Sequence, residues 1–257
     1  MSTPPALERV LKLLDAPPAD PDTTAGYLDL LGPAAEPPPS PAQRVMQSAF
    51  LPHIYEKVWR PVGFNLAKGW PFGPDTETEH ALARKRLGLG GPSDAGTPAA
   101  TVLDVACGPG NVTRALATGV AADGLVVGID VSATMLARAV ADTTASQVAY
   151  VRGNAVDLPF RTGSYDAVCC LGALYLIADP WAAIDGMTRV LKRGGALVIL
   201  TSLRRPLLAP AGPAVTRLTG IRLFGPDEVT EQLSARGYVE IRRRSYGLMQ
   251  FVSARLS

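Results

Sequence analysis

Short apolar runs alternate with amphipathic segments from about residue 100 to residue 203. The runs are rich in Val, Ile and Leu, and they predict buried strands over 100–106, 124–130, 148–153, 165–174 and 196–203. Helical spacing of apolar residues, with helix-starting residues ahead of the second and third segments, predicts helices over 111–118, 133–141 and 181–192. Strands that alternate with helices predict an α/β domain with a doubly wound, mostly parallel sheet.

The C-terminal pattern predicts a helix over 225–237 and then two strands, 238–246 and 248–256. A single residue, Gly247, separates the two strands, which favours an antiparallel hairpin at the edge of the sheet. With the five preceding strands, the hairpin completes an expected seven-stranded sheet.

The first hundred residues follow a different pattern. Residues 1–41 are rich in proline, and helical spacing occurs only over about 6–14, where one face carries Leu7, Val10, Leu11 and Leu14. The rest of this segment is expected to be extended or loosely packed. Helices are predicted over 42–50, 53–61 and 75–88. We therefore expect a Pro-rich segment (1–40), a helical cap with linker (41–97) and a main domain (98–257). The helices ahead of residue 98 would form a helical N-terminal extension of the main domain.

Composition and charge narrow the choice of partners. The 257 residues are 47% apolar and 19% charged, and the net charge is +2, too small to indicate a nucleic-acid or anionic-membrane partner. The basic run Arg242–Arg244 falls on an alternating strand, which would divide its charges between two faces. No apolar run approaches the roughly 18 residues of a membrane span, and the first residues do not resemble a secretion signal. A cytoplasmic location is expected.

The three cysteines do not indicate a metal site. Cys107 stands alone, Cys169 and Cys170 are adjacent in an apolar run, and no CxxC pair occurs. His53 and His80 lie far from all three in the sequence. This spacing does not match zinc ligands, so buried, reduced thiols are expected.

The segment "VLDVACGPG" (102–110) joins the first predicted strand to a helix through a glycine-rich turn. In a doubly wound sheet such a turn, together with an acid at the end of the next strand, marks a ligand site. Here the acid is Asp130, 20 residues after Gly110. Dinucleotides and adenosyl ligands both fit this arrangement.

Three details favour an adenosyl ligand that carries a positive charge. The third glycine of the dinucleotide fingerprint is replaced by Thr113, and Pro109 removes an N–H that could face an anion. Asp104 lies inside the strand, where it would repel a pyrophosphate and attract an ammonium group. The third detail is "GNAVDLPF" (153–160), which offers a polar residue followed by an N–H for an adenine edge.

Five segments together resemble the successive motifs of the class I S-adenosylmethionine-dependent methyltransferases: "VLDVACGPG", "VVGIDVSATML", "GNAVDLPF", "YDAVCCLGALYLIADP" and "RVLKRGGALVIL". They occur in the family's order over about 98–202, so the resemblance implies a Rossmann-like methyltransferase fold. The flanks "MQSAFLPHIYEKVWRP" and "FGPDEVTEQLSARGYVEIRRRSYGLMQFVSA" are similar to a subgroup from actinobacteria, cyanobacteria and plastids. In that subgroup a small Cys-containing knuckle commonly precedes "GYLDLL" (26–31). This chain has no cysteine there, so no metal is expected.

The resemblance implies roles for residues around the glycine turn. Asp104, with the backbone of Ala106, Gly108 and Gly110, would hold the methionine part of the cofactor. Asp130 would bind the ribose hydroxyls. Each residue also has an alternative role. Asp104 could be a structural acid bonded to backbone amides, and Asp130 could be a helix-capping acid. Gly108 and Gly110 could form a tight turn that binds no ligand.

The resemblance also implies an adenine and sulfonium side. Val131 and Met135 would lie against the adenine, Asn154 and Ala155 would meet its edge, and Leu171 would line the sulfonium side. The family usually has Asp where Asn154 stands. Asn keeps a carbonyl acceptor but has no charge, which would weaken binding, and it could also be only a turn residue.

The acceptor side has fewer signals. Related proteins often place a His after the fourth strand, and this chain has Tyr175 there, which can orient a hydroxyl but is a poor base near neutral pH. His53, in the predicted cap, is the other candidate catalytic residue, and a surface or core histidine is the alternative. The apolar segment 203–224 could form the wall of a lipophilic acceptor pocket or a helix packed on the sheet edge.

The predicted function is methyl transfer from S-adenosyl-L-methionine, with S-adenosyl-L-homocysteine as product, to a small, hydrophobic acceptor at oxygen or carbon. An NAD(P)-dependent oxidoreductase would use the same sheet, but the missing third glycine counts against it. A non-catalytic adenosyl-binding module is the other alternative. A nucleic-acid substrate and a membrane span are not expected.

Overall fold

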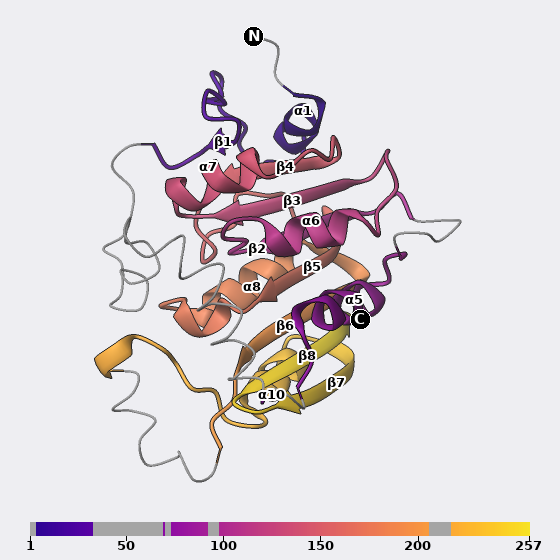
Figure 1. The fold of residues 1–257 in the computed structure, drawn as a ribbon, viewed down its shortest axis with the longest axis vertical. Coiled ribbons are helices and arrows are strands. Elements are labelled where there is room, and N and C mark those ends of the chain that lie inside the picture. Colours follow the sequence, from indigo (N-terminus) through magenta and orange to yellow (C-terminus); the bar gives the residue numbers. More distant parts are fainter. Residues whose placement is uncertain (1–3, 33–68, 70–72, 92–97, 206–216) are drawn as a thin grey trace.

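The computed structural model describes residues 4–32, 69, 73–91, 98–205 and 217–257. Its strands form one sheet in the order β1-β4-β3-β2-β5-β6-β8-β7 (Figure 1). The strands are β1 (Leu28–Asp29), β2 (Thr101–Val105), β3 (Leu125–Asp130), β4 (Val148–Arg152), β5 (Tyr165–Leu171), β6 (Leu191–Ser202), β7 (Tyr238–Tyr246) and β8 (Met249–Leu256). The α/β class and the mostly parallel sheet are confirmed, and the sheet has eight strands where seven were predicted.

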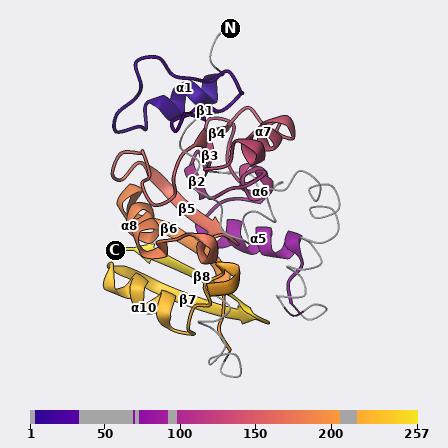
Figure 2. The same cartoon turned by 90° about the vertical axis from the view of Figure 1, so that its left-hand side faces the viewer.

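Helices cover both faces of this sheet (Figure 2). One face carries α5 (Thr76–Leu87), α6 (Asn111–Ala117) and α7 (Ala133–Ala141). The other carries α1 (Pro5–Leu11), α8 (Pro180–Val190) and α10 (Glu228–Ala235). Because both faces are covered, the central strands are buried on both sides, which explains their continuous runs of Val, Ile and Leu.

The chain direction within the sheet places the site. From β2 the connections run to β3 and β4 on one side, and then to β5 and β6 on the other side. All neighbouring pairs from β1 to β6 are parallel. The carboxyl ends of β2, β3 and β5 therefore meet where the strand order reverses, which is where open α/β sheets bind ligands.

The predicted C-terminal hairpin is confirmed. β8 pairs antiparallel with both β6 and β7, and Gly247 lies in the turn that joins β7 to β8. After β6 the chain passes through α10 into β7 at the edge of the sheet, and β8 then returns between β6 and β7. Only a short turn joins β7 to β8, because antiparallel neighbours need no crossover.

The predicted helix over 75–88 is also confirmed by its ends. The Asp75 side chain accepts a hydrogen bond from the Thr78 amide at 2.8 Å, and Gly88 ends α5 with a left-handed φ of 76°. Aspartate is favoured at the start of a helix because its side chain can cap a backbone amide. Glycine is favoured at the end because it has no Cβ to strain the left-handed conformation. The helices predicted over 42–50 and 53–61 lie outside the described residues.

The N-terminal segment differs from its prediction. The short helix is present as α1, with Leu7 and Val10 buried, and Leu14 is buried beyond its end. Residues 28–29 are extended, which was one of the two expectations, but they are packed on the sheet and not loose. Leu28 is fully buried, and β1 pairs with the edge of β4 as the eighth strand. Whether 1–40, 41–97 and 98–257 are separate domains remains a prediction.

Candidate functional site

The turn between β2 and α6 has an unusual backbone. Ala106, Gly108 and Gly110 have φ values of 56°, 54° and 76°, and the left-handed region strains every residue except glycine. Among the described residues, no atom lies within 4 Å of a Cβ placed on Gly108, so these residues leave the space beside it open. A Cβ on Gly110 would lie 2.3 Å from the Tyr150 hydroxyl. One glycine therefore leaves room for a ligand, and the other allows the protein to pack.

Asp130 joins this turn to the end of β3. Its Oδ2 accepts a hydrogen bond from the Gly108 amide at 2.8 Å, and its Oδ1 accepts from the Ser132 amide at 2.9 Å. The Ser132 side chain in turn accepts from the Met135 amide and caps α7. One carboxylate thus orders the glycine turn and the start of a helix. A carboxylate oxygen can accept more than one hydrogen bond, and the contact of Asp130 with ribose hydroxyls stays a prediction.

Asp104 lies beneath the turn and is 1% exposed. Its Oδ2 accepts from the Thr113 hydroxyl at 2.7 Å, and its Oδ1 accepts from the Cys169 thiol at 3.4 Å. Burial raises the pKa of Asp104 to about 6, although these hydrogen bonds oppose the shift, and the Asp130 charge raises it further. Thr113 stands where a dinucleotide site has its third glycine, and here its hydroxyl holds Asp104 in place.

The loop after β4 holds Asn154 in a turn. The exposed Asn154 accepts from the Val156 amide through its side chain and from the Asp157 amide through its backbone carbonyl. These bonds are typical of a turn residue, which was the alternative role considered for Asn154. The side-chain carbonyl retains a second lone pair, so an adenine contact stays a prediction. Ala155 is half-buried beside it.

The end of β5 leads to the predicted acceptor side. Leu171 is buried at the strand end, and Tyr175 is 7% exposed in the 3₁₀ helix η2 (Leu174–Leu176). The Tyr175 backbone carbonyl accepts from the Arg222 amide at 2.9 Å, which brings the segment after β6 to this place. Val131 and Met135 are half-buried beyond Asp130. His53 lies outside the described residues.

The sequence reasoning missed Arg152, which is 5% exposed at the end of β4. It binds Asp29 of the N-terminal segment at 2.9 Å and the Val131 carbonyl at 3.1 Å. A basic residue at a strand end normally indicates the surface, and its partner lies 123 residues away, so no local signal could reveal it.

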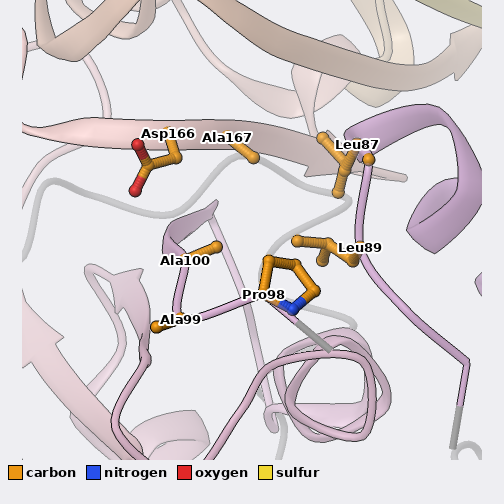
Figure 3. A pocket seen from close by; sticks show the side chains of 8 residues that line it. Leu87, Leu89, Pro98, Ala99, Ala100, Asp166 and Ala167 are labelled. Atoms are coloured by element: carbon orange, nitrogen blue, oxygen red, sulfur yellow. The ribbon is translucent and has the colours of Figure 1, made fainter. Parts of the chain in front are cut away.

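A cavity of about 280 Å³ lies elsewhere in the molecule (Figure 3). It is lined by Leu87, Gly88, Leu89, Pro98, Ala99, Ala100, Asp166 and Ala167. Residues 98–100 precede β2 and Asp166 is the second residue of β5, so this cavity lies at the amino ends of these strands. Both Asp166 oxygens serve the structure, one with the Thr101 amide and one with Lys192. It is separate from the candidate site.

The described parts of the chain carry neither a cluster of metal-binding side chains nor a membrane-spanning helix. There, no group of three His, Cys, Asp or Glu side chains is placed to hold a metal ion. Among the same residues, no helix has the length and apolar character that crossing a bilayer requires.

Residues 103–199 match the family described as "Methyltransferase domain". A demethylmenaquinone methyltransferase of Lactiplantibacillus plantarum is 41% identical over 117 residues, which cover 43% of this chain and 49% of that protein. The chain thus spans about half the length of the curated relatives that it matches.

Solved structures support the fold. An S-adenosylmethionine-dependent methyltransferase from Mesorhizobium loti has a TM-score of 0.55 at 21% identity, covering 68% of this chain and 96% of that one. The [4+2]-cyclase SpnF has a TM-score of 0.59 at 18% identity, covering 87% and 99%. At these identities the likeness concerns the fold alone. The resemblance of the sequence motifs to class I S-adenosylmethionine-dependent methyltransferases is confirmed, since residues 103–199 match the methyltransferase-domain family.

Proposed function

We propose that the chain transfers a methyl group from S-adenosyl-L-methionine to a small, hydrophobic acceptor at oxygen or carbon. The observation that carries this proposal is the bond from the Gly108 amide to Asp130, which joins the open glycine turn to the acid at the end of β3. Together they offer room for a ligand and carboxylate oxygens for a ribose at the point where the strand order reverses.

The charges at the site fit this cofactor. The bound cofactor would supply a methyl group on a positively charged sulfur, together with an ammonium group. Asp104 and Asp130 place negative charge on both sides of the turn, which suits a cation and disfavours a pyrophosphate. Since Thr113 binds Asp104, the residue in the third glycine position also argues against the NAD(P) alternative.

The acceptor must lie in line with the bond that breaks, so the protein's main task is to position it. The acceptor atom forms a bond to the methyl carbon, the carbon–sulfur bond breaks, and the acceptor loses its proton. Tyr175 could orient an acceptor hydroxyl, and His53 could accept the proton; both roles remain predictions.

The segment after β6 supports a wall beside Tyr175. Arg222 lies over the rings of Trp181 and Phe224, at 5.0 and 5.2 Å from their centroids, and these rings pack edge to face. Phe224 is fully buried, so of these two rings only the half-buried Trp181 could face a ring-bearing acceptor. The named activity of the bacterial relatives suggests a quinol-type ring as the first acceptor to try.

The experiment is an assay of methyl transfer from labelled S-adenosyl-L-methionine to a set of phenols and quinols that includes demethylmenaquinol. We expect a methylated product and stoichiometric S-adenosyl-L-homocysteine. Tight binding of the cofactor without product from any ring acceptor would favour the non-catalytic alternative, or another reaction on the same fold, as the SpnF cyclase has.

The affinity for S-adenosyl-L-homocysteine is expected to rise about tenfold between pH 5 and pH 7, because its ammonium group favours ionised Asp104. The pKa of Asp104 is raised to about 6, mainly by burial, so the carboxyl is mostly protonated at the lower pH. Calorimetry in buffers of different ionisation enthalpy should detect a proton released on binding near pH 6.

The raised pKa of Asp104 also sets the direction in which the stability of the ligand-free protein changes with pH. The folded state keeps the Asp104 proton to higher pH than the unfolded chain does, so the free energy of unfolding falls as pH rises from about 4 to about 6. Asp104→Asn should remove both pH dependences. If the pH dependence of binding or of stability persists in Asp104→Asn, another titratable group is responsible for it.

A further inference from the structure

Arg152 connects three parts of the chain at the carboxyl end of β4. Its Nη1 donates to Asp29 Oδ2 and to the Gly32 carbonyl, both at 2.9 Å, and its Nε donates to the Val131 carbonyl at 3.1 Å. The residue is 5% exposed, so this guanidinium is largely removed from water. A buried charge is tolerated only when it is paired and hydrogen-bonded, and these contacts meet that requirement.

The N-terminal segment is shaped to receive this guanidinium. Asp29 Oδ1 accepts from the amides of Leu31 and Gly32, at 2.9 and 3.0 Å, which folds residues 29–32 into a closed turn. Burial alone would raise the pKa of Asp29, but two backbone amides and the Arg152 charge lower it by more. The carboxylate therefore stays ionised as the partner of Arg152.

This contact lies on the adenine side of the candidate site. Val131, which accepts from Arg152, directly follows Asp130, and Asp130 is the register partner of Arg152 in the neighbouring strand. The Gly153 amide donates to the Asp130 carbonyl at 3.0 Å, and Asn154 comes next in the chain. The backbone on both sides of the predicted adenine position is thus tied to one side chain.

We propose that Arg152 is a positioning residue for adenosyl binding, and that residues 29–32 of the N-terminal segment hold it in place and so belong to the cofactor site. This inference rests on the proposed function. Arg152 acts through Val131 and the strand ends, and it needs no contact with the ligand. Its role is to fix the distance between the loop after β3 and the loop after β4.

The experiment measures the Kd of S-adenosyl-L-homocysteine by calorimetry for the full chain and for Arg152→Lys. Lysine keeps the charge but its single ammonium lacks the planar fork, so it cannot reproduce the three bonds. We expect the Kd to rise about tenfold or more, the loss that accompanies one well-ordered hydrogen bond to a charged group. Asp29→Asn, which keeps an acceptor oxygen, should raise the Kd in the same direction by less.

Arg189→Lys is the matched control. Arg189 also ties the N-terminal segment to the sheet, since it binds Asp15 and the carbonyls of Leu158 and Phe160. It lies in the last turn of α8 and holds the far end of the segment 153–160, whereas Arg152 holds the end that adjoins Asn154. Its replacement should lower the melting temperature while leaving the Kd within about twofold of the original value.

An effect on the Kd at Arg152 that is absent at Arg189 supports the inference. Equal losses at the two positions, or no loss at Arg152, would overturn it, because both patterns describe a merely structural residue. If Arg152→Lys does not fold, an unchanged Kd in Asp29→Asn would overturn it as well. Failure of the unsubstituted chain to bind S-adenosyl-L-homocysteine would instead count against the proposed function.

Discussion

Asp130→Ala should weaken the binding of S-adenosyl-L-homocysteine by at least about 100-fold, since two hydrogen bonds to a charged group are worth about 3 kcal/mol or more. The substitution removes the predicted ribose acceptor, and it also releases the Gly108 amide, which Asp130 holds at 2.8 Å. The glycine turn would lose its anchor as well as its ligand contact. Isothermal titration calorimetry measures the change directly.

Two variants separate these causes. Asp130→Asn keeps one oxygen that can accept from an amide, so it should retain the turn and lose mainly affinity. Asp157→Ala removes an exposed acid of the neighbouring loop and should leave the Kd unchanged. Retained tight binding in Asp130→Ala would refute the proposed ribose contact and the function that depends on it.

Features with local causes could be predicted from the sequence. The ends of α5 depend on Asp75 and Gly88, and each lies within four residues of the backbone groups that it serves. The central strands follow from apolar runs long enough to cross a sheet that is covered on both faces. The glycine turn and Asp130 could be found because both lie at strand ends, 20 residues apart.

Features with distant causes could not be predicted. β1 has two residues, too few for any periodicity, and it forms because Leu28 is buried beside β4. The same holds for the pair of Asp29 and Arg152, which are 123 residues apart. A proline-rich segment predicts little order by itself, and here the edge of the sheet supplies the order.

Some site residues have roles in the protein itself that the sequence did not reveal. Asp104 was expected to face a ligand, but it is buried beneath the turn and accepts bonds from Thr113 and Cys169. Asn154 was expected at the adenine edge, and its side chain closes a turn. Both residues are at the predicted place, and part of the hydrogen-bonding capacity of each side chain is taken up by bonds within the protein.

Gly110→Ala should destabilise the protein by about 2–5 kcal/mol, which combines left-handed strain with overpacking. Gly110 has a φ of 76°, and the new Cβ would lie 2.3 Å from the Tyr150 hydroxyl oxygen and 3.1 Å from the Ala139 Cβ. Tyr150 is 2% exposed and its hydroxyl bonds to Thr143, so the ring cannot move aside freely. Thermal unfolding should show a melting temperature lower by about 5–15 °C.

Gly194→Ala is the control, because Gly194 has the same φ of 76° and a Cβ there would meet no atom of the described residues within 4 Å. It should show the strain without the collision, a loss of about 1–2 kcal/mol. Adding Tyr150→Phe to Gly110→Ala removes the nearest oxygen, so the two changes together should cost less than the sum of their separate effects. Equal losses at Gly110 and Gly194, or strict additivity in the double variant, would contradict the collision. Glycine would then be required at position 110 only because of the left-handed backbone conformation.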